Sequence, residues 1–193
     1  MSLTSQRDSA PLPARTTFVL GGARSGKSAH AERLAQASGL PVSYLATAAV
    51  PRLDDPSVDL EFAARIALHQ ARRPAHWRTV ETGIDLAGAL DRASPGCVLI
   101  DCLTLWLTAL FYPEGENGPY ADWAERIAAF DEVLASSASR VIVVSNEIGL
   151  GVVPMGAQTR RFVDELGRLN QRIAARCDEV VMMVAGIPMS VKP

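Results

Sequence analysis

The sequence is poor in lysine, in cysteine and in long apolar runs. Only two of its 19 basic residues are lysines, Lys27 and Lys192, and its formal net charge is -2. A protein that binds nucleic acid in general needs an excess of positive charge, so this balance argues against that class. It leaves room for a local basic pocket that binds phosphate groups.

The three cysteines, Cys97, Cys102 and Cys177, form no C-x-x-C pair, and an odd number cannot all form disulfides. We expect reduced thiols in the core of a cytoplasmic protein. Asp101 interrupts the longest apolar run before it reaches the about 18 residues of a membrane span. Residues 1–15 contain no hydrophobic stretch of signal-peptide type, and we expect them to form a disordered tail.

The remaining residues, 16–193, are expected to form a single domain, since this length suffices for one substantial core. Short apolar runs that predict strands occupy residues 16–20, 42–47, 97–100, 141–145 and 180–184. Helical patterns occupy residues 28–38, 59–73, 85–92 and 120–136, and an apolar helical stripe contains Phe162, Leu166, Leu169 and Ile173. This alternation predicts an α/β fold with a mostly parallel central sheet between two layers of helices.

The first predicted strand leads into a phosphate-binding motif. Residues 21–28 read GGARSGKS and satisfy G-x-x-x-x-G-K-[ST], with an apolar strand before them and a helix after them. Glycines let backbone N–H groups turn toward phosphate oxygens, and the helix N-terminus adds a favourable dipole. The expected nucleotide-binding residues are Gly21, Gly22, Ala23, Arg24, Ser25, Gly26, Lys27 and Ser28, within a P-loop NTPase-like (RecA-like) fold.

A second motif supplies an acidic group for a metal ion. Residues 98–101 read Val-Leu-Ile-Asp, so Asp101 ends an apolar strand in the manner of a Walker B segment. We predict that Ser28 and Asp101 bind Mg²⁺, although an aspartate in this position also serves as a helix cap. The two motifs indicate nucleotide binding and leave the reaction open.

Further segments resemble one family. They include ATA at 46–48, RIALH at 65–69, RPAHWRTVE at 73–81, DCLT at 101–104, SNEIGLGVVP at 145–154 and GRLNQ at 167–171. With the P-loop, they resemble the bifunctional adenosylcobinamide kinase and adenosylcobinamide-phosphate guanylyltransferase of cobalamin biosynthesis. The similarity extends from about residue 17 to residue 192. The sequence departs from the family pattern in three places. Its loop at 49–58 is longer, and Phe62 and Leu68 stand where family members have other residues.

The resemblance implies two reactions. ATP or GTP phosphorylates a hydroxyl of adenosylcobinamide; GTP then donates GMP to a histidine, which passes it to adenosylcobinamide phosphate to give adenosylcobinamide-GDP. His69 matches the family's guanylylated histidine. A neutral imidazole is a competent nucleophile near pH 7, whereas outside the family pattern His69 reads as a solvated histidine on a helix. Similar enzymes assemble as trimers, so a homo-oligomer is expected.

The resemblance also implies nucleotide contacts away from the P-loop. They are Ala46, Thr47, Ala48, Gln70, Ala71, Arg72, Arg73, Glu81 and Asp101. Arg72, Arg73 and Arg78 lie close to His69 in sequence and can offset charge on the α-phosphate. For Asn146 and Glu147, contact with the corrinoid and a structural role in a turn both stay open.

Two other functions are compatible with the P-loop. A kinase of a small alcohol has the same P-loop but forms no guanylylated intermediate. A nucleotide-dependent switch typically reads guanine with an Asn-Lys-x-Asp segment, and the nearest candidate, residues 146–149, lacks the lysine and the aspartate.

Overall fold

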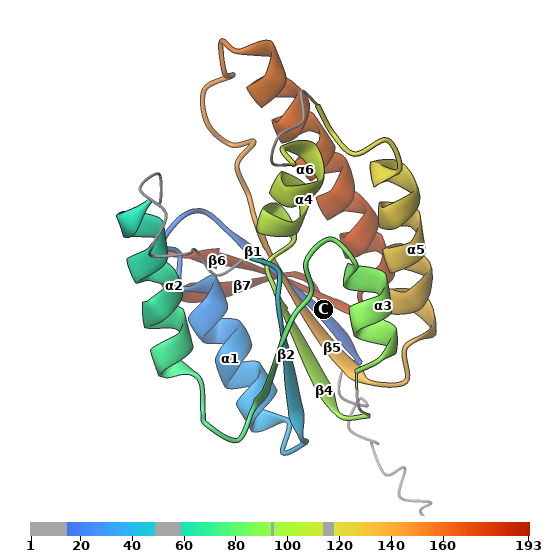
Figure 1. Ribbon diagram of the computed structural model, residues 1–193. Helices are drawn as coiled ribbons and strands as arrows, with labels where there is room; N and C mark the ends of the chain where they lie inside the picture. The colour runs from blue at the N-terminus through green and yellow to red at the C-terminus, as the bar shows by residue number, and fades with distance from the viewer. Residues whose placement is uncertain (1–14, 49–58, 94, 114–117) are drawn as a thin grey trace, which may run out of the picture.

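A central sheet with helices on both faces forms the molecule (Figure 1). The computed structural model describes residues 15–48, 59–93, 95–113 and 118–193. Its strands are β1 (Thr16–Gly21), β2 (Val42–Ala46), β3 (Arg78–Glu81), β4 (Cys97–Asp101), β5 (Arg140–Asn146), β6 (Glu179–Val184) and β7 (Ile187–Lys192). Its helices are α1 (Lys27–Ala37), α2 (Leu60–Arg72), α3 (Leu86–Asp91), α4 (Leu103–Phe111), α5 (Trp123–Ser136) and α6 (Ala157–Arg176).

The strand order is β3-β2-β4-β5-β1-β6-β7, and every neighbouring pair is parallel except β6 with β7. One strand, β5, therefore separates β1, which leads into the P-loop, from β4, which ends at Asp101. The parallel strands place their carboxyl ends at one edge of the sheet, where ligands bind in open α/β folds. The predicted α/β fold is confirmed.

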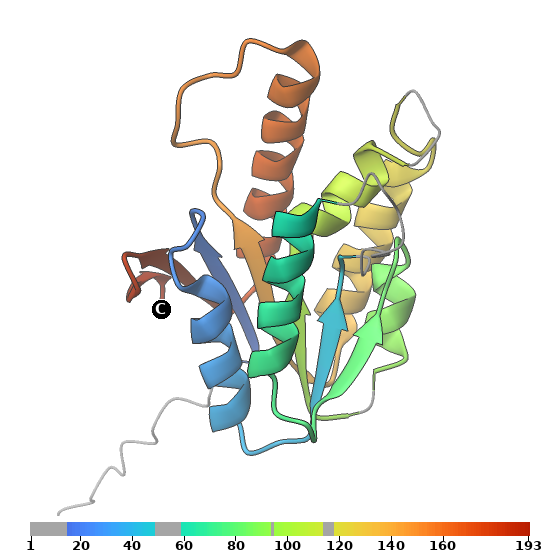
Figure 2. The same ribbon diagram turned by 60° about the vertical axis from the view of Figure 1, so that its left-hand side comes forward.

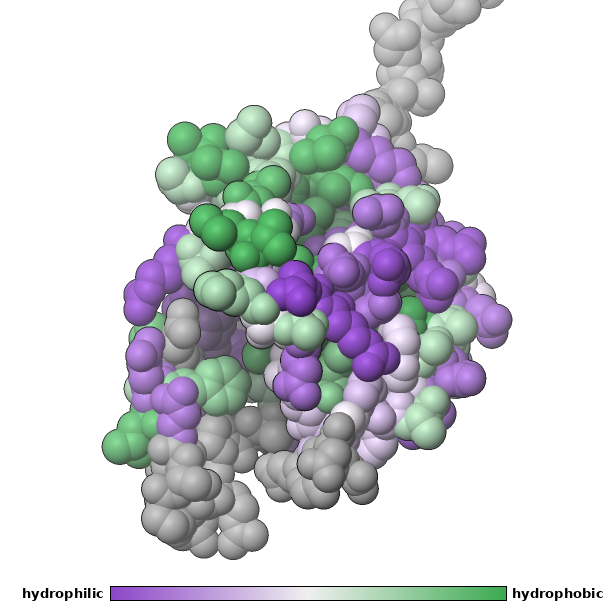
Figure 3. All heavy atoms as spheres, turned by 90° about the horizontal axis from the view of Figure 1, so that it is seen from above, coloured by the Kyte–Doolittle hydropathy of each residue, from purple (hydrophilic) through white to green (hydrophobic). Residues whose placement is uncertain are grey.

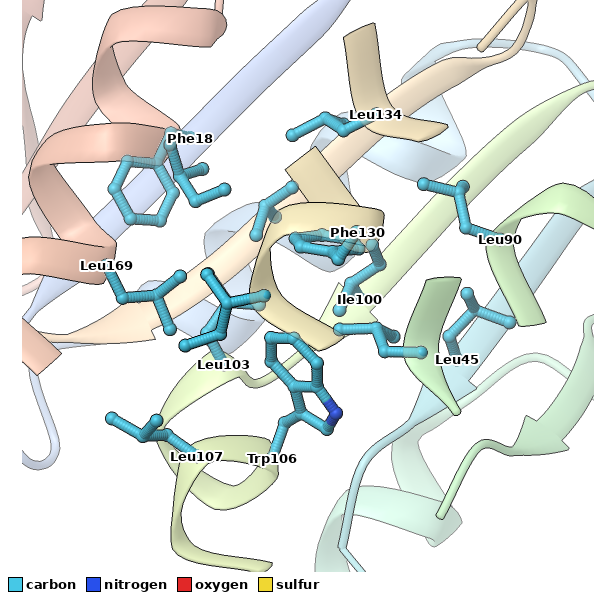
Figure 4. Close-up of a cluster of buried hydrophobic side chains, with 14 of the residues drawn as sticks. Phe18, Leu45, Leu90, Ile100, Leu103, Trp106, Leu107, Phe130, Leu134 and Leu169 are labelled. Atoms are coloured by element: carbon cyan, nitrogen blue, oxygen red, sulfur yellow. The ribbon is translucent and has the colours of Figure 1, made fainter. Parts of the chain in front are cut away.

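Alternating side chains of the strands face two separate apolar layers. Phe18, Val98 and Ile100 pack against α3, α4, α5 and α6, together with buried side chains such as Trp106 and Phe130 (Figure 4). On the opposite face, Val19 and Leu99 belong to a smaller cluster that includes residues of α1. Sheets covered on both faces carry such near-continuous apolar strands. Figure 2 shows α1 and α2 side by side.

Most predicted elements are found, with small shifts at their ends. The predicted helix at 120–136 begins only at Trp123, because residues 120–122 form a turn in which Tyr120 N donates to Leu110 O of α4 at 2.9 Å. The sequence interpretation missed α4 and β7, and none of its predicted strands covers β3. The predicted loop at 49–58 lies outside the described residues.

The other general expectations have mixed outcomes. The three cysteines are free and buried, as predicted. The predicted disordered tail includes Arg15, yet the backbone N–H of Arg15 donates to Asp178 Oδ2 at 3.0 Å and its guanidinium donates to Ser137 O at 2.9 Å. Among helices in the described parts of the chain, none has the length and hydropathy needed to cross a bilayer.

Candidate active site

The P-loop joins the end of β1 to the start of α1. A Cβ added at Gly21 would lie 2.4 Å from Ser25 Oγ and 2.9 Å from the carbonyl oxygen of Met183, so the chain requires glycine there. Gly26 is the N-cap of α1 and has φ +90°, a left-handed conformation that glycine adopts without strain. The loop therefore turns tightly, and α1 begins directly after it, so the backbone N–H groups of the first helical turn lie next to the loop.

Neighbouring segments hold this loop in place. The amide of Glu147, after β5, donates to Gly21 O at 3.1 Å, and the amide of Gly186, in the β6–β7 turn, donates to Ser25 O at 3.0 Å. Lys27 Nζ donates to Gly22 O at 3.2 Å, so the ammonium group lies over the loop. Glycine-rich backbone, a helix N-terminus and a lysine together suit the phosphates of a nucleotide.

The register of the sheet aligns three further predicted residues. Asp101 of β4 lies opposite Ala46 of β2, which in turn lies opposite Glu81 of β3. Thr47 continues from β2 and forms two hydrogen bonds through its hydroxyl with the backbone of Cys102, at 2.7 and 2.8 Å. These residues therefore share the carboxyl-end edge of the sheet with the P-loop.

The fold does not bring Glu81 to the P-loop, nor Arg78, which lies on the same strand. This strand, β3, is four positions from β1 in the sheet, which corresponds to roughly 19 Å at about 4.8 Å per strand. Glu81 lines a pocket of about 140 Å³ with Arg78, Thr82 and Arg92 among others. That volume is well below the roughly 300 Å³ at which small-molecule pockets begin.

Asp101 links the P-loop to the opposite side of the site. Its Oδ1 accepts a long hydrogen bond from Ser28 Oγ at 3.4 Å, and its Oδ2 accepts from the hydroxyl of Tyr44 at 2.9 Å. The Asp101 side chain is only 7 % exposed. A serine hydroxyl and a carboxylate oxygen this close are hard oxygen donors of the kind Mg²⁺ prefers, so Ser28 and Asp101 fit the predicted metal site.

Helix α2 carries His69 to the same carboxylate. The Asp59 side chain accepts from Phe62 N at 3.0 Å and caps the start of the helix. Near its end, His69 Nδ1 lies 4.0 Å from Asp101 Oδ2, with 36 % of the His69 side chain exposed. The imidazole is thus close to the Asp101 carboxylate and still accessible to solvent.

The residues after His69 differ in their surroundings. Gln70 and Ala71 are exposed, and Arg72 donates to Glu32 of α1 at 3.0 Å. Arg73, directly after the helix, stacks its guanidinium over the ring of Tyr44, 3.6 Å from the ring centroid. Of these four predicted residues, Arg73 is therefore the one tied to the Asp101 cluster.

Tyr44 is the member of this cluster that sequence reasoning missed. Burial, followed by the neighbouring Asp101 charge, raises the pKa of Tyr44 far above its usual value, so its hydroxyl stays protonated and donates. Nothing in residues 42–47 alone marks Tyr44 as more than core. The available signal was that a buried tyrosine hydroxyl usually has a hydrogen-bond partner.

Exposed apolar residues also gather beyond the end of β5. Leu150, Val152, Val153 and Met155 are between 73 and 97 % exposed. Seen from above, the molecule has hydrophobic surface groups beside hydrophilic ones (Figure 3). Glu147, at the start of this segment, accepts from Gly149 N at 2.6 Å, so its carboxylate turns into its own loop.

The fold and the site together define a P-loop nucleotide-binding enzyme of the α/β class. Comparison with known proteins narrows the class. The family model described as "Cobinamide kinase / cobinamide phosphate guanyltransferase" matches residues 17–191. The chain therefore belongs to this family.

Similarity to individual relatives supports the same family. The chain is 53% identical over 180 residues to the "Bifunctional adenosylcobalamin biosynthesis protein CobP" of Pseudomonas aeruginosa, covering 91% of this chain and 96% of that protein. It is 42% identical over 186 residues to the corresponding CobU protein of Salmonella typhimurium, covering 91% and 98%. A solved ATPase from a bacterial type III secretion system is similar in fold alone, with TM-score 0.54, 10% identity and coverage of 91% of this chain and 56% of that one.

Proposed function

We propose that the chain is a cytoplasmic enzyme that phosphorylates adenosylcobinamide with ATP or GTP and then transfers GMP from GTP to adenosylcobinamide phosphate. Membership of the cobinamide kinase and guanyltransferase family supports both activities. The observation that carries the proposal is that one carboxylate, Asp101, lies between the P-loop residue Ser28 and the imidazole of His69. The phosphate-binding loop and the nucleophile thus share one site.

The kinase reaction uses the P-loop. Its backbone amides and Lys27 bind the β- and γ-phosphates. The substrate hydroxyl attacks the γ-phosphorus, the bond from this phosphorus to the bridging oxygen breaks, and ADP or GDP and the hydroxyl proton are released. Ser28 and Asp101 would hold Mg²⁺, which neutralises phosphate charge when it is bound. The protein's contribution is mainly positioning and electrostatic stabilisation.

The guanylyl transfer uses His69. Its ring nitrogen attacks the α-phosphorus of GTP, a P–N bond forms, and pyrophosphate leaves. A phosphate oxygen of adenosylcobinamide phosphate then attacks the same phosphorus, and the P–N bond breaks to release adenosylcobinamide-GDP and His69. Arg73 is placed to offset charge on the α-phosphate.

The remaining nucleotide contacts are assigned by position. Ala46 ends β2 opposite Asp101, and Thr47 and Ala48 follow it. These three residues line the nucleotide site, as do residues 70–73 at the end of α2. Glu81 is too far from the P-loop to touch the same phosphates, so we assign it to the guanine nucleoside end of an extended GTP. One P-loop then serves both reactions in turn.

The enzyme's other partners follow from its surface. Exposed apolar residues beyond β5 support binding of a large corrinoid substrate near the carboxyl-end edge. On the edge strand β7, Ile187, Met189 and Val191 are 54 to 65 % exposed, which supports contact with further copies of the chain, as a trimer. We place no nucleic acid among the partners, given the net charge of -2.

The covalent intermediate provides the test. Protein incubated with Mg²⁺ and GTP labelled at the α-phosphate is expected to retain acid-labile, base-stable label. His69→Ala abolishes this label and leaves phosphorylation of adenosylcobinamide intact, while His76→Ala, a matched change at an exposed histidine, keeps the label. Label that survives in His69→Ala contradicts the mechanism, and phosphorylation without any label in the unaltered protein identifies a kinase alone.

A further inference from the structure

Tyr44 contacts two charged residues of the site at once. It lies on β2 with 1 % of its surface exposed. Its hydroxyl donates to Asp101 Oδ2 at 2.9 Å, and its ring faces the guanidinium of Arg73 at 3.6 Å. A buried phenol that donates to a carboxylate forms a charge-assisted hydrogen bond, which is stronger than one between neutral groups.

This hydrogen bond determines how the Asp101 carboxylate is turned. With Oδ2 held by Tyr44, Oδ1 faces Ser28 at 3.4 Å. Oδ2 is then the oxygen nearest to His69, 4.0 Å from Nδ1. Rotation of the carboxylate about its bond to Cβ would break the bond to Tyr44 in a place where water has little access, since the side chain is 7 % exposed.

We propose that Tyr44 is a positioning residue for guanylyl transfer, and that Asp101, held by it, receives the Nδ1 proton of His69 in a hydrogen bond and leaves Nε2 as the nucleophile. This inference rests on the proposed role of His69. The ring nitrogen that carries the proton is set by the hydrogen bond that nitrogen makes. The 4.0 Å separation shortens to a hydrogen bond when the nucleotide binds, as catalytic hydrogen bonds commonly do.

In the transfer step, the bond that forms at Nε2 replaces the bond to the leaving pyrophosphate. The Nε2 lone pair forms a bond to the α-phosphorus, the bond from this phosphorus to the bridging oxygen breaks, and the electron pair leaves with pyrophosphate. The imidazole ring gains one positive charge, keeps its Nδ1 proton, and faces the negative Oδ2 of Asp101. When the substrate phosphate attacks, the N–P electron pair returns to Nε2.

Tyr44→Phe isolates the hydroxyl, because it retains the buried ring and the surface against which Arg73 stacks. The matched control is Tyr112→Phe, which removes the same atom from a tyrosine 48 % exposed at the end of α4. Labelling of each protein with α-labelled GTP is followed in single turnovers over a range of GTP concentrations. Removing a group that orients a ligating or reacting residue typically costs about 10- to 100-fold.

We expect Tyr44→Phe to label at least about 10-fold more slowly at saturating GTP, with the half-saturating GTP concentration and the melting temperature close to those of the unaltered protein. Tyr112→Phe labels at the normal rate. A second readout requires no turnover. Nitrogen-15 NMR of the protein saturated with α,β-methylene-GTP, which cannot release pyrophosphate, with the His69 signals assigned from their loss in His69→Ala, detects the Nδ1–H tautomer in the unaltered protein and a larger share of the Nε2–H tautomer in Tyr44→Phe.

The outcomes separate the two proposals. No label on the unaltered protein contradicts guanylyl transfer itself. Label on the unaltered protein, with Tyr44→Phe labelling within twofold of the same rate, contradicts only the role of Tyr44. The role of Tyr44 is also contradicted if Tyr44→Phe labels slowly but needs a correspondingly higher GTP concentration for half-saturation or has a lower melting temperature. It is contradicted as well if the phosphorus of guanylylated His69 is bonded to Nδ1.

Discussion

At Gly21 the P-loop leaves no space for a side chain. A Cβ there would lie 2.9 Å from the backbone oxygen of Met183 and 2.4 Å from Ser25 Oγ. The serine can rotate, but the carbonyl belongs to the adjacent strand β6 and moves only with it. We expect Gly21→Ala to lower the free energy of unfolding by about 1–3 kcal/mol, as overpacking usually does. Thermal unfolding without nucleotide measures it.

Gly22 provides the matched comparison. A Cβ added there meets no atom within 4 Å. Gly22→Ala therefore keeps the melting temperature within a degree or two, whereas Gly21→Ala lowers it by about 2–12 °C on the usual scale for a chain of this length. Equal melting temperatures for the two variants would contradict the tight closure of the loop.

At this scale the sequence predicted the P-loop and Asp101 because their chemistry is written in contiguous residues. It did not predict Tyr44, because Tyr44 and Asp101 are 57 residues apart in the sequence and meet only through the register between β2 and β4. The order of the strands, which also depends on long-range pairing, separates Glu81 from the P-loop. Local patterns identify groups that bind phosphate, and long-range pairing decides which of them meet.

His69 lies near the end of α2, so its position depends on the stability of this helix. The Asp59 side chain caps it through Phe62 N at 3.0 Å. Replacing such a cap with alanine costs about 0.5–2 kcal/mol. We expect Asp59→Ala to increase hydrogen exchange of the α2 amides and to slow guanylylation of His69 several-fold. Exchange measured by mass spectrometry, with the labelling assay, checks both effects.

Asp85 allows a matched control, since its side chain caps α3 through Gly88 N at 2.9 Å. Asp85→Ala removes the same kind of hydrogen bond from a helix that carries no proposed site residue. It is expected to increase exchange in α3 and leave guanylylation unchanged. If the two variants slow guanylylation equally, the effect belongs to global stability and the link between the α2 cap and His69 is wrong.

The elements that were missed share a physical explanation. Helix α4 is apolar on most sides, with five of its nine residues buried, so it shows no amphipathic period and merges with the apolar run of β4. Strand β7 is exposed along its length and contains Pro188, which is unusual inside a strand. Strand β3 has only four residues, three of them exposed. Hydrophobic periodicity in a sequence predicts elements with one buried and one exposed face. Helix α4 is apolar on most sides, and β3 and β7 are mostly exposed, so they lack this periodicity.

For the whole molecule, we propose that residues 16–193 unfold as one cooperative domain. The cysteines test this because they lie in both apolar layers. Cys97 and Cys102 belong to the cluster that includes α1, and Cys177 belongs to the cluster beneath α3 to α6. Burial raises the pKa of Cys102 and of Cys177 to about 12 and also raises the pKa of Cys97.

Since the thiolate is the reactive form, raised pKa values together with burial make all three thiols unreactive at pH 8 while the protein is folded. We expect a thiol reagent to modify none of them within minutes in buffer, and all three in urea at one midpoint shared with the loss of helical circular dichroism. Because Cys177 lies in one layer and Cys97 and Cys102 lie in the other, a shared midpoint requires both layers to unfold together. Peptide mass spectrometry assigns each modified cysteine, and exposure of Cys177 at lower urea than Cys97 and Cys102 would mean that the two layers unfold separately.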